Sequence, residues 1–235
     1  MAESLALLSF GETGWGDELA AGAWLTIRLA LATLPFGLVL GFLIALAKVS
    51  GEPALRRGAN IYTTIFRGVP ELLTLFIVYY GGQIALQAFI GLFTDTYVEV
   101  SGFVAGMIAL ALVFSAFSSE VFVAALKAIP KGQGEAAWAL GMSRRATLQS
   151  VILPQLIRLA LPGLSNLWLI LLKETALVSV IALDDLLRRT SVAVGNTKEP
   201  FLFYMVACLI YLAFSLISAF GLGKVERWTR RGEAR

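Results

Sequence analysis

Five long apolar stretches, separated by short polar segments, run along the 235 residues of this chain. A helix needs about 20 apolar residues, at a rise of about 1.5 Å each, to cross a bilayer, and each stretch is that long. Backbone N–H and C=O groups must be bonded within lipid, and the stretches lack the alternation of a membrane β-barrel, so they are predicted to be helices. The sequence therefore predicts an all-α integral membrane protein with a single transmembrane domain over residues 1–235. The predicted spans are residues 24–49, 61–93, 102–126, 151–172 and 201–222.

The segment between the fourth and fifth spans, residues 173–200, has mixed polarity. Its apolar part, residues 176–183, suits a short re-entrant helix followed by an outer loop, and the pattern leaves open whether that helix forms. Asp184 and Asp185, next to two arginines, are expected on a solvated outer surface that meets a binding protein.

Small residues and prolines inside the spans indicate a packed and bent bundle. Pro35, Pro70 and Pro162 are predicted to lie in helices and to bend them, because proline removes a backbone hydrogen bond. Gly37, Gly41 and Ala45 form a row of small residues along the first span, which allows close approach of another helix. These features support a helical bundle and no particular function.

The distribution of lysine and arginine predicts the orientation. Residues 1–25 and the loop 93–101 contain none, whereas the segments 48–67 and 127–158 contain four and five, and the tail from residue 224 contains five more. Positive residues accumulate in cytoplasmic segments. We expect a multi-pass membrane protein with its N-terminus outside and its C-terminus in the cytoplasm. The acidic start lacks the positive region of a cleavable signal peptide.

Composition narrows the classes of function. The chain is 58% hydrophobic and 15% charged, with a mean hydropathy of +0.79, against about 45–50% and about 25% in soluble domains. It has one cysteine and no histidine, so an intrachain disulfide, the usual zinc sites and a histidine-based catalytic triad are not expected. No phosphate loop occurs, because the Gly-Lys pair at residues 223–224 lacks the first glycine and the following hydroxyl. The chain is predicted not to be an enzyme, and any ATPase must be a separate polypeptide.

The segment between the third and fourth spans, residues 127–150, contains a short apolar helix on the expected cytoplasmic side. Gly132 and Gly134 are expected to precede the helix, Glu135 to begin it and Gly141 to cap its end. Its middle, including Trp138, is apolar, and an apolar helix outside the bilayer needs a covering partner or must lie on lipid headgroups. The chemistry of the residues alone leaves both alternatives open.

The same segment resembles the EAA loop of bacterial ABC-importer permeases. The matching positions are Glu135, Ala136, Ala137, Gly141, Val151, Leu153 and Pro154, with Val151 in place of the commoner isoleucine. The resemblance implies the type I importer permease fold of five transmembrane helices and a cytoplasmic coupling helix that docks into an ATPase subunit. It assigns that contact to Glu135, Ala136, Ala137, Leu140 and Gly141.

Three further segments, residues 67–71, 129–133 and 173–179, are similar to signatures of the polar amino acid branch of these permeases. This likeness implies a multi-pass subunit of the bacterial inner membrane, with a periplasmic N-terminus and a cytoplasmic C-terminus. Such a subunit moves a polar, cationic amino acid or an opine across that membrane. A neutral polar amino acid is the alternative, and an ion-driven secondary transporter is disfavoured by the EAA loop. The implied partners are two ATPase subunits that bind the ATP and magnesium, a homologous but non-identical second permease, a periplasmic solute-binding protein and the lipid bilayer. Neither a cofactor or metal in this chain nor a nucleic acid partner is expected.

Charges at bilayer depth are costly and usually functional, so the acids and lysine of the spans are candidates for contact with the solute. Glu174, Glu71, Lys173 and Asn166 are the predicted solute contacts, Glu174 first because an acid is common there in the resembling family. Arg67 and Glu71 are four residues apart, which places them on one face if the helix is continuous, and a pair between them is the competing expectation.

Glu120 is also a candidate charge, but no role is assigned to it. The resembling family usually has an Arg-Gly pair shortly after this glutamate, and this chain has Val123 and Ala124 there. The function of that arginine must therefore be absent or supplied by another residue.

Overall fold

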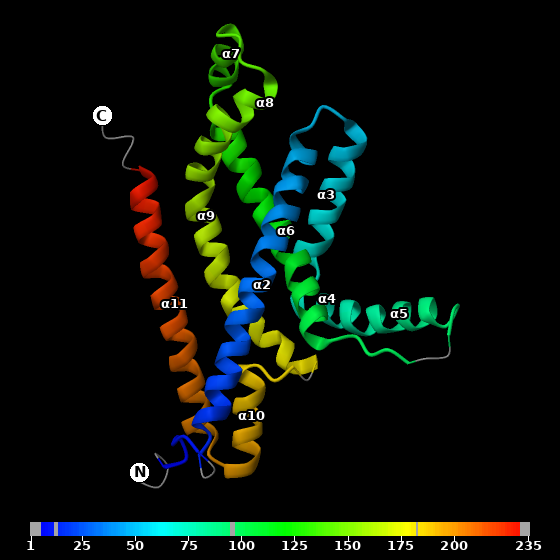
Figure 1. The fold of residues 1–235 in the computed structure, drawn as a ribbon, viewed down its shortest axis with the longest axis vertical. Coiled ribbons are helices and arrows are strands. Elements are labelled where there is room, and N and C mark those ends of the chain that lie inside the picture. The colour runs from blue at the N-terminus through cyan, green and yellow to red at the C-terminus, as the bar shows by residue number, and fades with distance from the viewer. Residues whose placement is uncertain (1–5, 12–13, 95–96, 182, 231–235) are drawn as a thin grey trace.

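The computed structural model describes residues 6–11, 14–94, 97–181 and 183–230, and every regular element within these ranges is helical. Figure 1 shows an elongated bundle with a small helical lobe beyond one end. The helices are α2 (Gly16–Val49), α3 (Pro53–Gly68), α4 (Glu71–Phe76), α5 (Gly82–Ile90), α6 (Gly102–Ala128), α7 (Lys131–Ala139), α8 (Arg144–Thr147), α9 (Leu153–Glu174), α10 (Leu186–Thr197) and α11 (Pro200–Arg230). π-Helical turns join α4 to α5 and α8 to α9, and a 3₁₀ segment, Thr175–Ile181, follows α9.

Five helical stretches are long and apolar enough to cross a membrane, which confirms the predicted number and the all-α membrane class. They are Gly16–Val49, Glu71–Ile90, Gly102–Ala128, Arg144–Ile181 and Pro200–Thr229. Most extend past the predicted ends, because polar residues such as Asp17 and Lys127 continue the helices outside the apolar pattern. The largest difference is in the second span.

The small-residue row of the first span packs against α6. The ring of Phe114 lies over Gly37, and a Cβ added to Gly41 would come within 2.0 Å of the Ser118 Oγ. The Ser118 hydroxyl also donates a hydrogen bond of 3.3 Å to the Gly37 carbonyl oxygen. The glycines therefore let α2 and α6 approach closely along most of the bundle, as their pattern predicts.

The second span is not the continuous helix 61–93 that its hydropathy predicts. Helix α3 ends at Gly68, Val69 and Pro70 have extended backbone conformations, and α4 begins at Glu71. A residue before proline is pushed away from the helical region, and proline suits a helix start better than its interior. Pro70 therefore breaks the helix and does not bend it, whereas Pro35 and Pro162 lie inside helices as expected.

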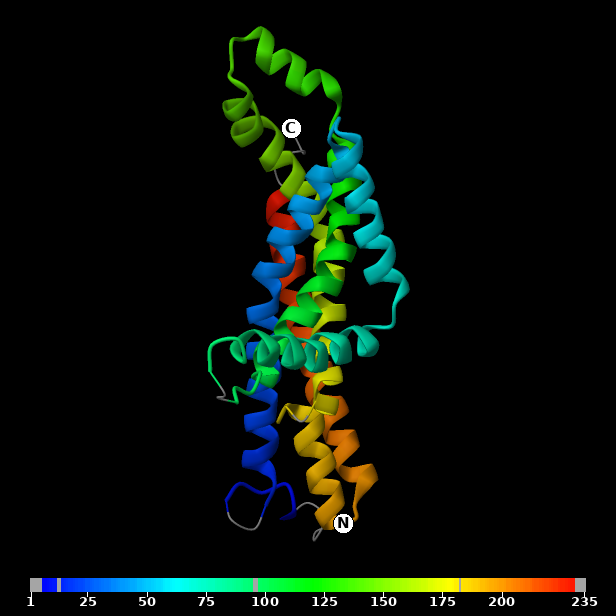
Figure 2. The same cartoon turned by 90° about the vertical axis from the view of Figure 1, so that its right-hand side faces the viewer.

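This break redirects the chain. Helix α3 runs beside α2 and α6, and α4 and α5 then cross the bundle at a steep angle near the middle of its length (Figure 2). Tyr62 holds α3 in place, because its hydroxyl is 2.8 Å from the Ser115 Oγ of α6. Helix α5 projects from the bundle with much of its apolar surface exposed, including Ile84 at 72%.

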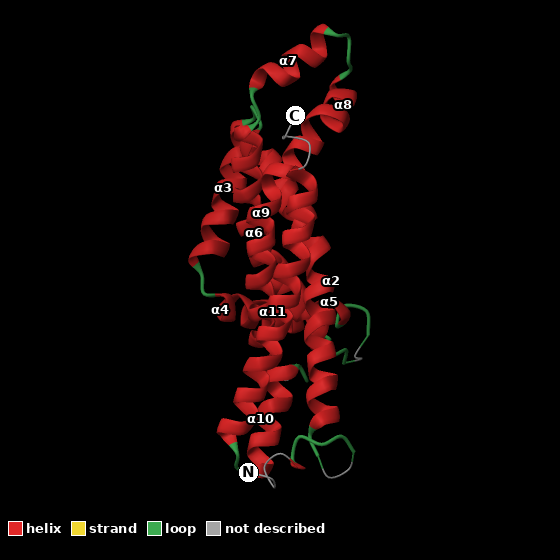
Figure 3. Cartoon of the chain, turned by 90° about the vertical axis from the view of Figure 1, so that its left-hand side faces the viewer, coloured by secondary structure: helices red, strands yellow, loops and turns green. Residues whose placement is uncertain are grey.

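The predicted outer loop is largely a helix. The 3₁₀ segment Thr175–Ile181 continues directly from α9, residue 182 lies outside the described residues, and α10 then packs on α2. Because α10 contains two arginines and several polar residues, its sequence was interpreted as a loop and not as an amphipathic helix. Figure 3 shows α10 at the end of the bundle opposite α7 and α8.

The two aspartates before α10 have different environments, so the expectation of a solvated outer pair is wrong for one of them. Asp184 is exposed and accepts a bond of 3.1 Å from Arg189. Asp185 is fully buried, and its Oδ1 accepts a bond of 2.9 Å from the Arg188 N–H, which caps α10. Burial raises the pKa of Asp185 to about 6, in spite of the backbone N–H bonds that stabilise its charged form. Asp185 therefore anchors α10, and only Asp184 is available on the surface.

Candidate functional site

Helix α7 lies beyond the end of the bundle, joined to α6 and α8 by short connections (Figures 1 and 2). It begins at Lys131 directly after Pro130, whose fixed φ suits a helix start. Gly132 and Gly134 thus lie inside the helix and Glu135 in its middle, which corrects the expectation that the glycines precede it. Each glycine inside a helix costs about 1 kcal/mol relative to alanine. The helix start at Pro130 offsets this cost, so α7 forms with both glycines inside it.

The C-terminus of α7 has the geometry that its sequence predicts. Gly141 follows the C-cap residue Leu140 with φ of +79°, a left-handed conformation that favours glycine. The Gly141 N–H bonds to the Trp138 carbonyl at 2.9 Å and the Met142 N–H bonds to the Ala137 carbonyl at 3.0 Å. These two bonds form a Schellman motif, which fixes the direction in which the chain leaves α7.

The side chains of α7 divide into an inner and an outer side. Ala137 is buried at 4% exposure, whereas Glu135 and Ala136 are exposed, Trp138 is 55% exposed and Leu140 is 84% exposed. The apolar outer side has no covering partner in the described chain. A groove between α7 and the start of the fourth span opens on the bundle side, lined by Leu126, Ile129, Pro130, Lys131, Gly134, Trp138, Arg144, Thr147, Leu148 and Ile152.

A second group of predicted residues lies where α4 crosses the bundle. Glu174 is the last residue of α9 and is half-buried beside a cavity of ≈ 70 Å³ that Phe114 and Phe117 of α6 help to line. Glu71 begins α4, which packs on the 3₁₀ segment after Glu174. Because α4 and this segment are in contact, the two carboxylates lie in the same part of the bundle. The structure therefore brings together the two acids that the sequence analysis placed in different spans.

The remaining predicted solute contacts lie on the exposed side of α9. Asn166 is exposed and lies two helical turns before Glu174, on the same face, because residues four apart are neighbours on a helix. Lys173 is exposed, and its charge attracts Glu174. Among the residues that the structure describes, no ion pair involves Glu71, Lys173 or Glu174. Both carboxylates are thus available to a ligand.

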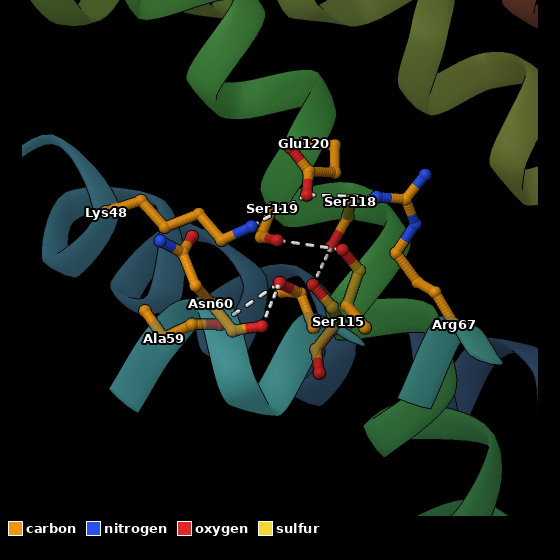
Figure 4. Close-up of polar contacts among 10 residues, drawn as sticks. Lys48, Ala59, Asn60, Arg67, Ser115, Ser118, Ser119 and Glu120 are labelled. Carbon is orange, nitrogen blue, oxygen red and sulfur yellow. Dashed lines mark hydrogen bonds and ion pairs between the residues drawn. The ribbon is translucent and has the colours of Figure 1, made fainter. Parts of the chain in front are cut away.

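Arg67 does not pair with Glu71, so that expectation is wrong. The helix breaks between them, and the Arg67 Nη1 lies 3.0 Å from the Glu120 Oε1 on α6. The Lys48 Nζ, from the end of α2, lies 2.6 Å from the same oxygen. Figure 4 shows both cations reaching Glu120 from opposite sides.

These ion pairs bear on the Arg-Gly pair that this chain replaces with Val123 and Ala124. Lys48 and Arg67, far from Glu120 in sequence, supply the positive charge that the missing arginine does not. Sequence reasoning treated the three residues separately. All three residues are charged and are expected near the cytoplasmic end of a span. This shared position was the signal in the sequence that they could pair. The shared carboxylate ties α2, α3 and α6 together at that end.

The fold and the two groups of residues define a membrane transport subunit. Two of the five membrane helices carry Glu71 and Glu174, one acid each, and α7 protrudes beyond one end of the bundle (Figure 2). Within the described ranges, no group of histidine, cysteine and acidic residues is arranged to hold a metal ion.

Comparison with known proteins identifies the family. Residues 14–231 match the family described as "Binding-protein-dependent transport system inner membrane component", and the chain belongs to this family. The chain is 44% identical to the nopaline transport system permease protein NocQ of Agrobacterium fabrum, covering 97% of this chain and 98% of that protein. It is 40% identical to the arginine ABC transporter permease protein ArtQ of Haemophilus influenzae, covering 88% and 92%.

A solved structure confirms the type I importer permease fold. The crystal structure described as an amino acid ABC transporter with histidines superimposes with a TM-score of 0.77 at 32% identity, covering 91% of this chain and 94% of that one. The predictions of an ABC-importer permease subunit in the inner membrane, and of a chain that is not itself an enzyme, are confirmed by the family and by relatives described as permease proteins. Membership also implies a solute-binding protein and an ATPase as partners.

Proposed function

We propose that the chain forms half of the membrane channel for a cationic amino acid, or an opine derived from one, and that Glu174 and Glu71 contact the solute. The observation that carries the proposal is that α4, which Glu71 begins, packs on the 3₁₀ segment directly after Glu174, and that neither carboxylate has an ion-pair partner in the described chain. The two relatives reported above support it, since they are described as permease proteins for nopaline and for arginine.

Desolvation gives the physical reason for two acids in the channel. A charged group that leaves water without a partner loses several kcal/mol of hydration free energy. Two nearby carboxylates repel each other when both are ionised, and a solute cation between them relieves that repulsion. The Asn166 amide, on the same face of α9, supplies neutral hydrogen bonds to the polar remainder of the solute.

One observation favours the alternative of a neutral polar amino acid. Lys173 is adjacent to Glu174 and attracts it, which lowers the charge that Glu174 presents to a solute. Because Lys173 is exposed and forms no ion pair within the described part of the chain, we assign it to the entrance of the solute path. Even if Lys173 neutralises Glu174, the carboxylate of Glu71 keeps the net charge of the three residues negative.

Solute competition separates the two alternatives. In cells that take up labelled arginine through this system, an excess of unlabelled lysine, ornithine or nopaline is expected to reduce uptake strongly, and an excess of glutamine or glutamate only slightly. Equal or stronger competition by glutamine would favour the neutral solute.

The coupling role is assigned to the outer side of α7. We propose that Leu140, Glu135, Ala136 and the turn at Gly141 dock on an ATPase subunit, while buried Ala137 holds the helix to its own chain. The proposed complex has two such ATPase subunits, which bind the ATP and magnesium. A homologous, non-identical permease completes the channel, and the exposed apolar surface of the projecting α5 suits a contact with it.

The proposed orientation places α7 in the cytoplasm and α10 in the periplasm, near the solute-binding protein. Reporter fusions after Ser101 and near Asn196 are expected to report the periplasm, and fusions after Gly51, Gly134 and Arg235 the cytoplasm. The reason is the accumulation of lysine and arginine at the α7 end. A single inverted reporter, confirmed with an enzyme of the opposite compartment preference, would contradict the assignment of five spans.

A further inference from the structure

A polar pocket lies between α2, α3 and α6 at the end of the bundle that carries α7. Its volume is ≈ 570 Å³, and its lining includes three cationic side chains, those of Lys48, Arg56 and Lys127, together with Asn60 and Glu120. The ATPase-coupling and solute-path residues are not part of it. Figure 4 shows Lys48, Asn60 and Glu120 grouped around this part of the bundle.

The charges of the pocket do not balance. Glu120 is its one acid, and Lys48 and Arg67 already neutralise that carboxylate at 2.6 and 3.0 Å. Among the described residues, neither Arg56 nor Lys127 has an ion-pair partner. Arg56 also lies in the first turn of α3, which contains no acidic residue and where the helix dipole disfavours a cation. An anion bound between Arg56 and Lys127 would stabilise this arrangement.

The same helices carry an apolar groove deeper in the membrane. It has a volume of ≈ 570 Å³ and is lined by apolar side chains of α2 and α6, from Pro35 to Leu43 and from Met107 to Leu112. Lys48 lies five positions after Leu43 on α2, a rise of about 7.5 Å. The two helices therefore offer a surface for an acyl chain and, nearer their ends, a cationic pocket for a headgroup.

We propose that this pocket binds the phosphate of an anionic phospholipid in the leaflet at the α7 end, with Arg56 and Lys127 as its cationic ligands. Basic pockets between membrane helices suit such headgroups. The hydroxyl of Ser50 and the amide of Asn60, which also line the pocket, add hydrogen-bonding groups for the phosphate and glycerol oxygens. The bound lipid would join α2, α3 and α6 beside the ion pairs of Glu120.

The experiment compares two double variants of the full chain, purified in mild detergent with the subunits that accompany it. Arg56→Gln with Lys127→Gln removes the two pocket cations that have no partner. Arg57→Gln with Lys224→Gln removes the same charge from two residues that do not line the pocket, and is the matched control. Phosphatidylglycerol, phosphatidylcholine and inorganic phosphate are titrated separately, and bound lipid is counted by native mass spectrometry.

The proposal predicts that the wild type retains phosphatidylglycerol in preference to phosphatidylcholine. The pocket variant is expected to bind phosphatidylglycerol on the order of tenfold more weakly, and the control variant to be nearly unchanged. If the pocket variant does not assemble, Lys127→Gln alone is expected to give an intermediate loss. Equal losses in the pocket and control variants, or no preference for phosphatidylglycerol, would overturn the site, and displacement of the lipid by inorganic phosphate at similar concentration would overturn its assignment to a lipid.

Discussion

Leu140→Asp is expected to abolish ATP-dependent uptake while leaving membrane insertion and the amount of folded protein unchanged. Leu140 is 84% exposed at the C-cap of α7, so it contributes almost nothing to packing within its own chain. In the proposed complex it is buried against the ATPase, where a carboxylate without a partner costs several kcal/mol. Uptake of labelled solute and ATPase activity of the purified complex, measured against the amount of assembled complex, check the expectation.

Two further variants distinguish loss of the proposed ATPase contact from a general effect of substitutions in α7. Leu140→Met keeps an apolar side chain of similar volume and is expected to retain most uptake. Gly132→Ala lies inside the helix with open space around its Cβ position, and is expected to be neutral or slightly stabilising. Full uptake by Leu140→Asp would show that this face of α7 does not contact the ATPase.

Glu174→Gln is expected to lower the rate constant kcat/KM for uptake of a cationic solute at least about tenfold, equivalent to about 1.4 kcal/mol. The substitution keeps the size of the side chain and removes the charge that would compensate a solute cation. Glu71→Gln is expected to act in the same direction but less strongly, because Glu71 lies at the start of α4, outside the lining of the cavity beside Glu174. Initial uptake rates over a range of solute concentrations provide the measurement.

The matched control is Glu52→Gln, which makes the same substitution at an exposed residue before α3 whose side chain forms no cap bond. It is expected to leave the rate for the cationic solute unchanged, as is the basal ATPase activity of the Glu174 variant. Unaltered half-saturation and rate for arginine, lysine and opines in Glu174→Gln would rule out this carboxylate as a ligand.

The parts of the fold that the sequence predicts well are those governed by local chemistry. The lengths of the apolar stretches specify five membrane helices, and Gly141 specifies the end of α7 because only a left-handed residue completes the Schellman motif. The small residues Gly37 and Gly41 likewise predict the close contact between α2 and α6.

The parts that the sequence misses depend on contacts between distant residues. The hydropathy of residues 61–93 is continuous across Pro70, and the extended conformations of Val69 and Pro70 separate α3 from α4. A continuous helix there would place Arg67 and Glu71 on one face. The break instead sends Arg67 to Glu120 and leaves Glu71 near Glu174, so one proline accounts for the errors in both the span and the ion pair.

Solute-stimulated ATP hydrolysis tests the proposed function most directly. The complex of this chain with its partner permease and ATPase is reconstituted in proteoliposomes, and ATP hydrolysis is measured with the binding protein loaded in turn with arginine, nopaline, glutamine and glutamate. We expect stimulation by arginine or nopaline, loss of that stimulation in Glu174→Gln, and little stimulation by glutamine or glutamate. Strong stimulation by glutamine, retained in Glu174→Gln, would contradict a cation-selective path through the two carboxylates.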